Sequence, residues 1–473
     1  MLASLADTPS HPAKRRSVSG RDEPLRAAWV ALGLALLLAG CAETPTSSLV
    51  DGSGLAADAA RVDAARADAG LPDAGLPDAG LTDAGLADAA PPDAGLTDAA
   101  VVVADAGSPA VVRGTVQYED RPFDEHGFTG ELAPRPARQV TVSLLDATGA
   151  VLATGTTDDD GRFELAPAAP IVTAVTVRAR AEVAFAGHRA RVIDRRGRGS
   201  VYTVESPPFD VSAAADVTLL ARADTGIGGA FNIVDVLYSA FLVYAPHVGT
   251  PAPTLTVQWQ AGLSFACSSC YAGDVISLGG QLADTDEYDD GIILHEAGHY
   301  FVDHYSRDTS PGGAHRDRLV DPELAYGEGV GYFFACMVLG SPLIVDTYLG
   351  SNRIMQFEAV TLDGVSRTDF VGTSTGRIDG QLREEIVAGI LWDAFDAASA
   401  AEPFDRVALG VAGQLAILVD YFGTWPHADQ GAPGIDVADF LHALVCEAGV
   451  PAADAEALAA NRGLPWTAGP CLP

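Results

Sequence analysis

The chain has 473 residues and a formal net charge of −34, with 63 acidic residues against 29 Lys and Arg. This balance argues against nucleic acids and anionic lipid surfaces as partners, because both carry the same sign of charge. The residues that follow position 108 are numerous enough for two domains with their own hydrophobic cores.

The first 41 residues have the features of an exported lipoprotein. Basic residues precede the apolar run 27–39, which is too short to cross a bilayer but suits the core of a secretion signal. Leu38-Ala39-Gly40-Cys41 resembles the bacterial lipobox, which implies cleavage before Cys41 and a lipid on its sulfur. Ala42 is not the aspartate that retains many such proteins in the inner membrane, so we expect a lipid-anchored protein of the outer membrane. An ordinary cleaved signal with a chance cysteine is the alternative.

Residues 42–108 are predicted to be a disordered tether. Aspartate recurs every five residues from Asp58 to Asp98, with Ala, Gly, Leu and Pro between. This period matches neither a helix nor a strand, and the like charges extend the chain. A flexible coil of about 65 residues spans on the order of 45 Å. A calcium-binding repeat is the alternative, but each aspartate lacks neighbouring oxygen ligands.

Residues 109–222 have a β pattern rich in Val, Thr and Ile. Asp159-Asp160-Gly161 lies between two candidate strands and suits a tight turn. The run from Thr156 to Phe163 resembles the transthyretin-like, carboxypeptidase-regulatory type of β-sandwich, which implies a spacer or accessory module. The aspartates are interpreted as a solvated turn rather than a cation site. The candidate strands are 111–118, 139–145, 151–155, 162–165, 172–179, 201–204 and 216–220.

From residue 223 the pattern becomes largely helical. A first helix is predicted over 232–244, and strands are predicted over 254–259 and 275–278. Such a strand would border a cleft and could pair with an extended peptide.

His295-Glu296-Ala297-Gly298-His299 is the motif that carries chemistry. On a helix the two histidines lie one turn apart on the same face, and the glutamate lies beside them. Two imidazoles, a carboxylate base and an open position for water are what a zinc hydrolase needs. Asp289 and Asp290 precede the apolar run and can cap the helix. The structural alternative is a buried amphipathic helix with satisfied histidines.

A third protein ligand must come from elsewhere in the chain. Val302 and Tyr305 occupy the positions of the glycine and third histidine of the longer HExxHxxGxxH motif, and His304 is one residue too early. Glu328 lies in a following predicted helix among small residues that allow tight packing. Glu323 is the less favoured choice because a helix would only begin at Pro322.

His295-Glu296-x-x-His299 followed by Glu328-Gly329-x-Gly331-Tyr332-Phe333 resembles the gluzincin metallopeptidases. The resemblance implies one zinc ion held by His295, His299 and Glu328, with Glu296 as general base. Alanine is commoner in the family at Gly331, a departure expected not to touch the chemistry. The expected fold class is multidomain: a disordered tether, a β-sandwich, and a mainly α (α+β) gluzincin-like domain over 223–473.

Five cysteines remain besides Cys41. Disulfides are the default in an exported protein. Cys446 with Cys471 would pin the C-terminal tail, and Cys267 with Cys270 can close a local loop. Cys336 is interpreted as a small buried apolar residue.

The expected activity is zinc-dependent hydrolysis of peptide bonds, with a peptide or protein as substrate. The oxyanion needs one donor besides zinc, and Tyr332, His315 and His427 are the candidates. Glu385 and Asp393, in a predicted helix, are candidates to orient a zinc-bound imidazole. The alternatives are an inactive binding or adhesion lipoprotein with a metallopeptidase fold, and a hydrolase of cell-wall peptides.

Overall fold

The computed structural model describes residues 111–471 with gaps at 125, 170, 172, 196–198, 212–215, 316–317, 349, 359–369, 372–379, 398–401, 425 and 427–428. The predicted signal, Cys41, the tether and His427 lie outside the described residues.

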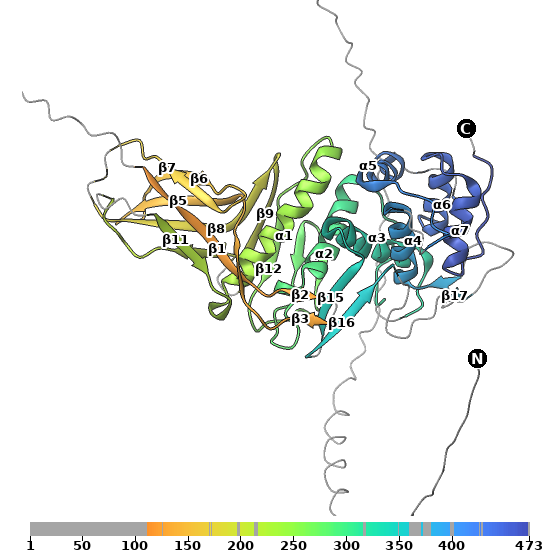
Figure 1. Cartoon of the computed structure of the whole chain (residues 1–473), viewed down its shortest axis with the longest axis horizontal. Coiled ribbons are helices and arrows are strands. Elements are labelled where there is room, and N and C mark those ends of the chain that lie inside the picture. Colours follow the sequence, from red (N-terminus) through yellow and green to blue (C-terminus); the bar gives the residue numbers. More distant parts are fainter. Residues whose placement is uncertain are drawn as a thin grey trace, which may run out of the picture. The chain divides into compact units, whose positions relative to one another are not determined.

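Strands dominate the chain up to residue 221, and most of them belong to two larger sheets (Figure 1). One sheet has the order β11-β1-β4, with β7 also paired to β1. The other has the order β13-β14-β12-β9-β8-β5-β6, with β10 paired to β8. Residues of β8 alternate between buried and partly exposed, as expected for a strand with one face on a core. The bounds are β1 Val112–Asp120, β4 Ala133–Pro136, β5 Val140–Asp146, β6 Val151–Thr156, β7 Arg162–Leu165, β8 Val175–Phe185, β9 His188–Asp194, β10 Thr203–Glu205, β11 Val217–Ala221, β12 Leu255–Trp259, β13 Cys270–Ala272 and β14 Val275–Ser277.

Every strand predicted from the sequence overlaps an observed strand, but several observed strands were not predicted, among them β9 and β13. In β9 buried and exposed residues alternate, and arginines fill two of the exposed positions. The segment is therefore less apolar than the strands that were predicted. β13 begins at Cys270 and has only three residues, which are too few to show the alternation of apolar and polar residues that predicts a strand. Both strands help to connect the sheet to the candidate site: β9 pairs with β12, and β13 pairs with β14 and lines the cavity of the site.

The larger sheet does not stop at the predicted domain boundary at residue 222. β12 pairs in parallel with β9, from Leu255 opposite Ala190 to Trp259 opposite Asp194. A parallel pair requires a long crossover connection, and the helix α1 (Gly228–Tyr244) lies within it. The β-rich and helix-rich parts of the chain therefore share one sheet.

The helix α1 is a core helix that is joined to the β-rich part by a partly buried ion pair. Arg138 Nε lies 2.8 Å from Asp235 Oδ1, and Tyr118 donates a hydrogen bond of 3.1 Å to the other carboxylate oxygen. By length and composition Gly228–His247 could cross a membrane, but 78% of its apolar window is buried in the protein. Burial against β1, β8 and β9 explains its apolar composition without a bilayer.

Three helices carry most of the predicted catalytic part: α2 (Asp290–Tyr305), α3 (Pro322–Leu339) and α4 (Glu384–Phe395). They pack in this order, α2 on α3 and α3 on α4. Glycines allow the close approach, since a Cβ on Gly298 would lie 3.0 Å from the Cα of Gly331. The remaining elements are β2 Phe123–Asp124, β3 Gly127–Phe128, β15 Leu343–Tyr348, β16 Ser351–Gln356, β17 Phe370–Val371, β18 Gln381–Leu382, α5 Gly410–Leu415, α6 Val437–Cys446 and α7 Ala452–Asn461, besides single-turn segments.

Two disulfides join the cysteine pairs considered from the sequence, Cys267 with Cys270 and Cys446 with Cys471. The second ties the tail to α6. Cys336 is a free, fully buried thiol in α3, as its helical position suggested.

Candidate metal centre

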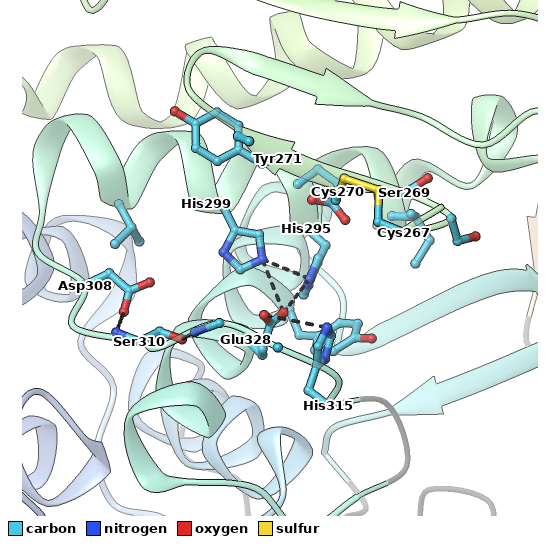
Figure 2. Close-up of a pocket in the computed structure, with 18 of the residues that line it drawn as sticks. Cys267, Ser269, Cys270, Tyr271, His295, His299, Asp308, Ser310, His315 and Glu328 are labelled. Atoms are coloured by element: carbon cyan, nitrogen blue, oxygen red, sulfur yellow. Dashed lines mark hydrogen bonds and ion pairs between the residues drawn. A yellow bond between two sulfur atoms is a disulfide. The ribbon is translucent and has the colours of Figure 1, made fainter. Parts of the chain in front are cut away.

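The two motif histidines and Glu328 converge at the interface of α2 and α3. His295 and His299 stand one turn apart on α2, with ring centroids 4.8 Å apart. Glu328 reaches them from α3, and Figure 2 shows its carboxylate between the two rings. The three closest donor atoms form a triangle. Its sides are 3.2 Å (His295 Nε2 to Glu328 Oε2), 3.2 Å (His295 Nε2 to His299 Nε2) and 3.3 Å (His299 Nε2 to Glu328 Oε2).

This triangle fits a tetrahedral zinc ion. Zinc holds nitrogen and oxygen donors at about 2.0–2.1 Å, so two donors of one tetrahedron are about 3.3–3.4 Å apart. The side chains are also of the kinds that zinc prefers, two imidazoles and a carboxylate. The residues present would therefore hold the predicted ion through these three atoms, at one wall of the cavity described below.

The donor atoms are strongly coupled electrostatically. Burial alone would raise the pKa of Glu328, but the hydrogen bonds and charges of the two histidines hold that pKa well below its ordinary value. Burial alone would lower the pKa of His299, yet the hydrogen bond and charge of Glu328 and the charge of Glu296 raise it to about 9. Positive charge, whether a proton or a metal ion, is thus favoured at this position.

Gly331 lies directly against the ring of His295, a contact that the sequence did not indicate. A Cβ at Gly331 would lie 2.9 Å from both Cε1 and Nδ1 of His295. His295 Nδ1 is buried and has no hydrogen-bond partner among the described residues. The ring is therefore oriented by packing against α3 and against Tyr332, whose ring centroid lies 4.2 Å away.

Glu384, the residue before the predicted Glu385, is the α4 carboxylate that reaches the site. His315 Nδ1 donates a hydrogen bond of 2.7 Å to Glu384 Oε2. Glu385 instead lies 3.4 Å from Arg353, and Asp393 binds the buried guanidinium of Arg462. The expectation that Glu385 or Asp393 orients a metal-bound imidazole was wrong, because the first turn of α4 presents Glu384 toward His315 and α4's later turns face the C-terminal helices.

Of the three predicted oxyanion donors, His315 and Tyr332 lie in the described cavity. His315 Nε2 is 3.7 Å from Glu328 Oε1, so its ring is aimed at the metal-binding position (Figure 2). Burial lowers the pKa of His315, but the hydrogen bond and charge of Glu384 outweigh burial and raise it. Tyr332 is 3% exposed and packs between His295 and Phe357. His315 is therefore the better-placed donor.

A cavity of about 1180 Å³ opens in front of the triangle and is also lined by Glu296. One wall is the disulfide loop from Cys267 to Cys270 and the edge strand β13 that continues from it (Figure 2). This wall is fastened to α2 by side chains, since Tyr271 donates to Asp303 at 2.7 Å and His304 lies 2.6 Å from Asp274. His304, excluded as a ligand from its spacing, thus belongs to the support of the wall.

The remaining predicted residues lie outside the triangle. The Glu323 carboxylate lies against Gly434, where a Cβ would be 2.4 Å from it, and Glu323 is not among the clustered donors. Asp289 occupies the N-cap position of α2, but its Oδ2 accepts hydrogen bonds from the N–H and hydroxyl of Thr347 instead of a helical N–H. The expected cap interaction is therefore absent, because β15 offers Asp289 a better donor pair.

Sequence reasoning missed Glu384 and a second cluster of carboxylates formed by Asp284, Asp286 and Asp346. The spacing of Asp284, Asp286 and Asp289 was a local signal for the second cluster, but Asp346 joins it only through the fold. No protein-family model matches this chain, and a search of curated proteins returns no significant match.

Proposed function

We propose that the protein is a zinc-dependent peptidase. The observation that supports this best is the triangle of donor atoms of His295, His299 and Glu328, with sides of 3.2–3.3 Å, at one wall of a cavity that Glu296 also lines. The resemblance of both motifs to the gluzincins agrees with it. A bound zinc ion would polarise the scissile carbonyl and lower the pKa of water toward about 7.

The other groups have distinct tasks in this proposal. Glu296, next to the first ligand, takes the proton of the attacking water and passes it to the leaving amine. His315, held by Glu384, donates a hydrogen bond to the developing oxyanion. Glu384 favours the charged form of this imidazole, which suits a donor placed where negative charge develops.

The substrate would bind along β13. This strand pairs with β14 on one side and is at the end of its sheet, so its other edge can pair with an extended peptide. Its residues line the cavity beside the histidines, so a peptide on this edge would pass the metal position.

Glu296→Gln separates an enzyme from a binding module. The amide keeps the shape of the side chain and removes the base, so peptide cleavage should fall by about 10²–10⁴. Zinc content should stay near one ion per chain, because Glu296 is not one of the three clustered donors. Cleavage of an unbiased peptide library and metal analysis of both proteins test this.

Two outcomes would contradict the proposal. Zinc-loaded wild type that cleaves no peptide would favour the binding or adhesion function. Cleavage of cell-wall peptides alone would favour a hydrolase of cell-wall peptides. A Gln variant as active as wild type would remove Glu296 from the mechanism.

We also propose that lipid on Cys41 anchors the enzyme, with residues 42–108 as its tether. This rests on the lipobox and the repeat. Cys41→Ser should move the protein from the membrane fraction to the soluble exported fraction, as measured by immunoblotting. Retention in the membrane would mean that a different anchor holds the protein.

A further inference from the structure

A second cluster of side chains of the kinds that bind metals contains only oxygen donors, and its Asp286 lines the same cavity as the first cluster. Carboxylate oxygens of Asp284, Asp286 and Asp346 all lie within 4.8 Å of one another. Asp286 and Asp346 are 2% and 1% exposed. The cluster joins the turn before α2 to the strand β15.

Asp289 provides an independent sign of a missing ligand. It is completely buried, and its Oδ2 is occupied by the N–H and hydroxyl of Thr347, the neighbour of Asp346. Its Oδ1 is also buried and has no hydrogen-bond partner among the described residues. The backbone N–H of Asp289 donates to the carbonyl of Asp286 at 3.1 Å, so Asp289 is next to the cluster in the chain and in space. Burial raises the pKa of Asp289, and the charges of Asp286 and Asp346 raise it further. A buried carboxylate oxygen without a donor is costly unless a cation or proton satisfies it.

Hydroxyl groups complete the oxygen-rich surroundings. Ser268 donates to Asp284 Oδ2 at 3.0 Å, and Ser269 donates to Asp286. Both serines lie between Cys267 and Cys270, in the loop that walls the cavity. In the described part of the chain, no Arg, Lys or His side chain forms an ion pair with Asp284, Asp286 or Asp289.

We infer that Asp284, Asp286 and Asp346, together with Asp289, form a Ca²⁺ site that holds the disulfide wall of the cavity against α2 and β15. Ca²⁺ binds oxygen donors at about 2.3–2.6 Å, so donors on opposite sides are about 4.6–5.2 Å apart, in keeping with the observed spread. Zinc prefers nitrogen and sulfur donors, and Mg²⁺ demands near-ideal octahedral geometry, whereas Ca²⁺ accepts irregular sets of carboxylates. The bound ion would neutralise buried negative charge and fix the start of the motif helix.

Calcium binding is measured on the full-length protein after dialysis into calcium-free buffer. Titration with CaCl₂ in a calorimeter should show one saturable site per chain, and the unfolding temperature should rise with CaCl₂. MgCl₂ at equal ionic strength should produce neither effect. Asp286→Asn and Asp284→Asn should lose the saturable site and the calcium-dependent rise in unfolding temperature.

Asp160→Asn is the matched control, because it removes the same charge from an exposed turn of the β-rich part. It should bind Ca²⁺ as wild type does, which separates a built site from general attraction to an acidic protein. If Asp286→Asn does not fold, the more exposed Asp284→Asn carries the test. The inference is overturned if wild type shows no saturable Ca²⁺ binding, or if a folded Asp284→Asn or Asp286→Asn binds Ca²⁺ like wild type.

This test is independent of the peptidase proposal. Glu296→Gln should still bind Ca²⁺, because Glu296 is outside the acidic cluster. If Ca²⁺ does not bind, the peptidase proposal still depends only on the cleavage results. If no peptide is cleaved, the calcium inference still depends only on the binding results.

Discussion

The two clusters of metal-binding side chains differ in their donor atoms and in the elements that carry them. His295, His299 and Glu328 offer two imidazole nitrogens and one carboxylate, all from the facing surfaces of two packed helices. The acidic cluster offers only carboxylates, from the turn before α2 and from β15.

In the two proposals, these clusters hold different ions. Imidazole nitrogen favours zinc, whereas a set made only of carboxylates favours hard ions such as Ca²⁺. Helices packed through glycines hold their donors in one arrangement, as a small tetrahedral ion requires. Ligands on a turn and a strand can adjust to the longer and more variable distances around Ca²⁺. The two sites should therefore respond to separate substitutions.

The largest effect is expected from removing a ligand of the triangle. His295→Ala and Glu328→Ala should each reduce zinc from about one ion per chain to near zero, because a site with three protein ligands does not survive the loss of one. Metal analysis of the purified proteins measures this. Glu323→Ala is the matched control in the same helix and should keep its zinc. Zinc retained in Glu328→Ala but lost in Glu323→Ala would reassign the third ligand.

A smaller effect is expected at His315, which does not belong to either cluster. His315→Ala should lower kcat by about 10²–10³, the usual cost of one oxyanion donor, with KM little changed and zinc retained. Tyr332→Phe removes only a hydroxyl and should change kcat much less. Steady-state kinetics on one cleaved peptide compares the two. A greater loss of kcat in Tyr332→Phe would transfer the role to Tyr332.

The smallest effect is expected at the glycines between the helices. Gly331→Ala should weaken zinc binding by about 10–100-fold, the range seen when the support of a ligand is disturbed, because the new methyl group meets the His295 ring. The new Cβ of Gly329→Ala would lie 2.5 Å from the Cβ of Val387 in α4. This substitution should therefore lower the unfolding temperature with little change in zinc affinity. Competition with a zinc chelator and thermal unfolding separate these effects. Equal zinc affinity in wild type and Gly331→Ala would show that the ring is not held by this contact.

The local patterns of the sequence were sufficient to predict the grouping of His295, His299 and Glu328 and about half of the observed strands. The spacing of His295 and His299 places both rings on one face of any helix, and the small residues after Glu328 allow its helix to approach. Alternation of apolar residues likewise predicts a strand wherever one face is buried, as in β8.

Contacts between distant segments were decided only by the tertiary structure. Glu384 rather than Glu385 reaches His315 because of the rotation of α4 about its axis, which its packing on α3 sets. Asp346 joins Asp286 only because β15 lies beside the start of α2, and β12 continues the sheet only because α1 returns the chain to β9. Sequence spacing determines which side chains share one face of an element, whereas the burial of apolar surface between elements determines which faces meet.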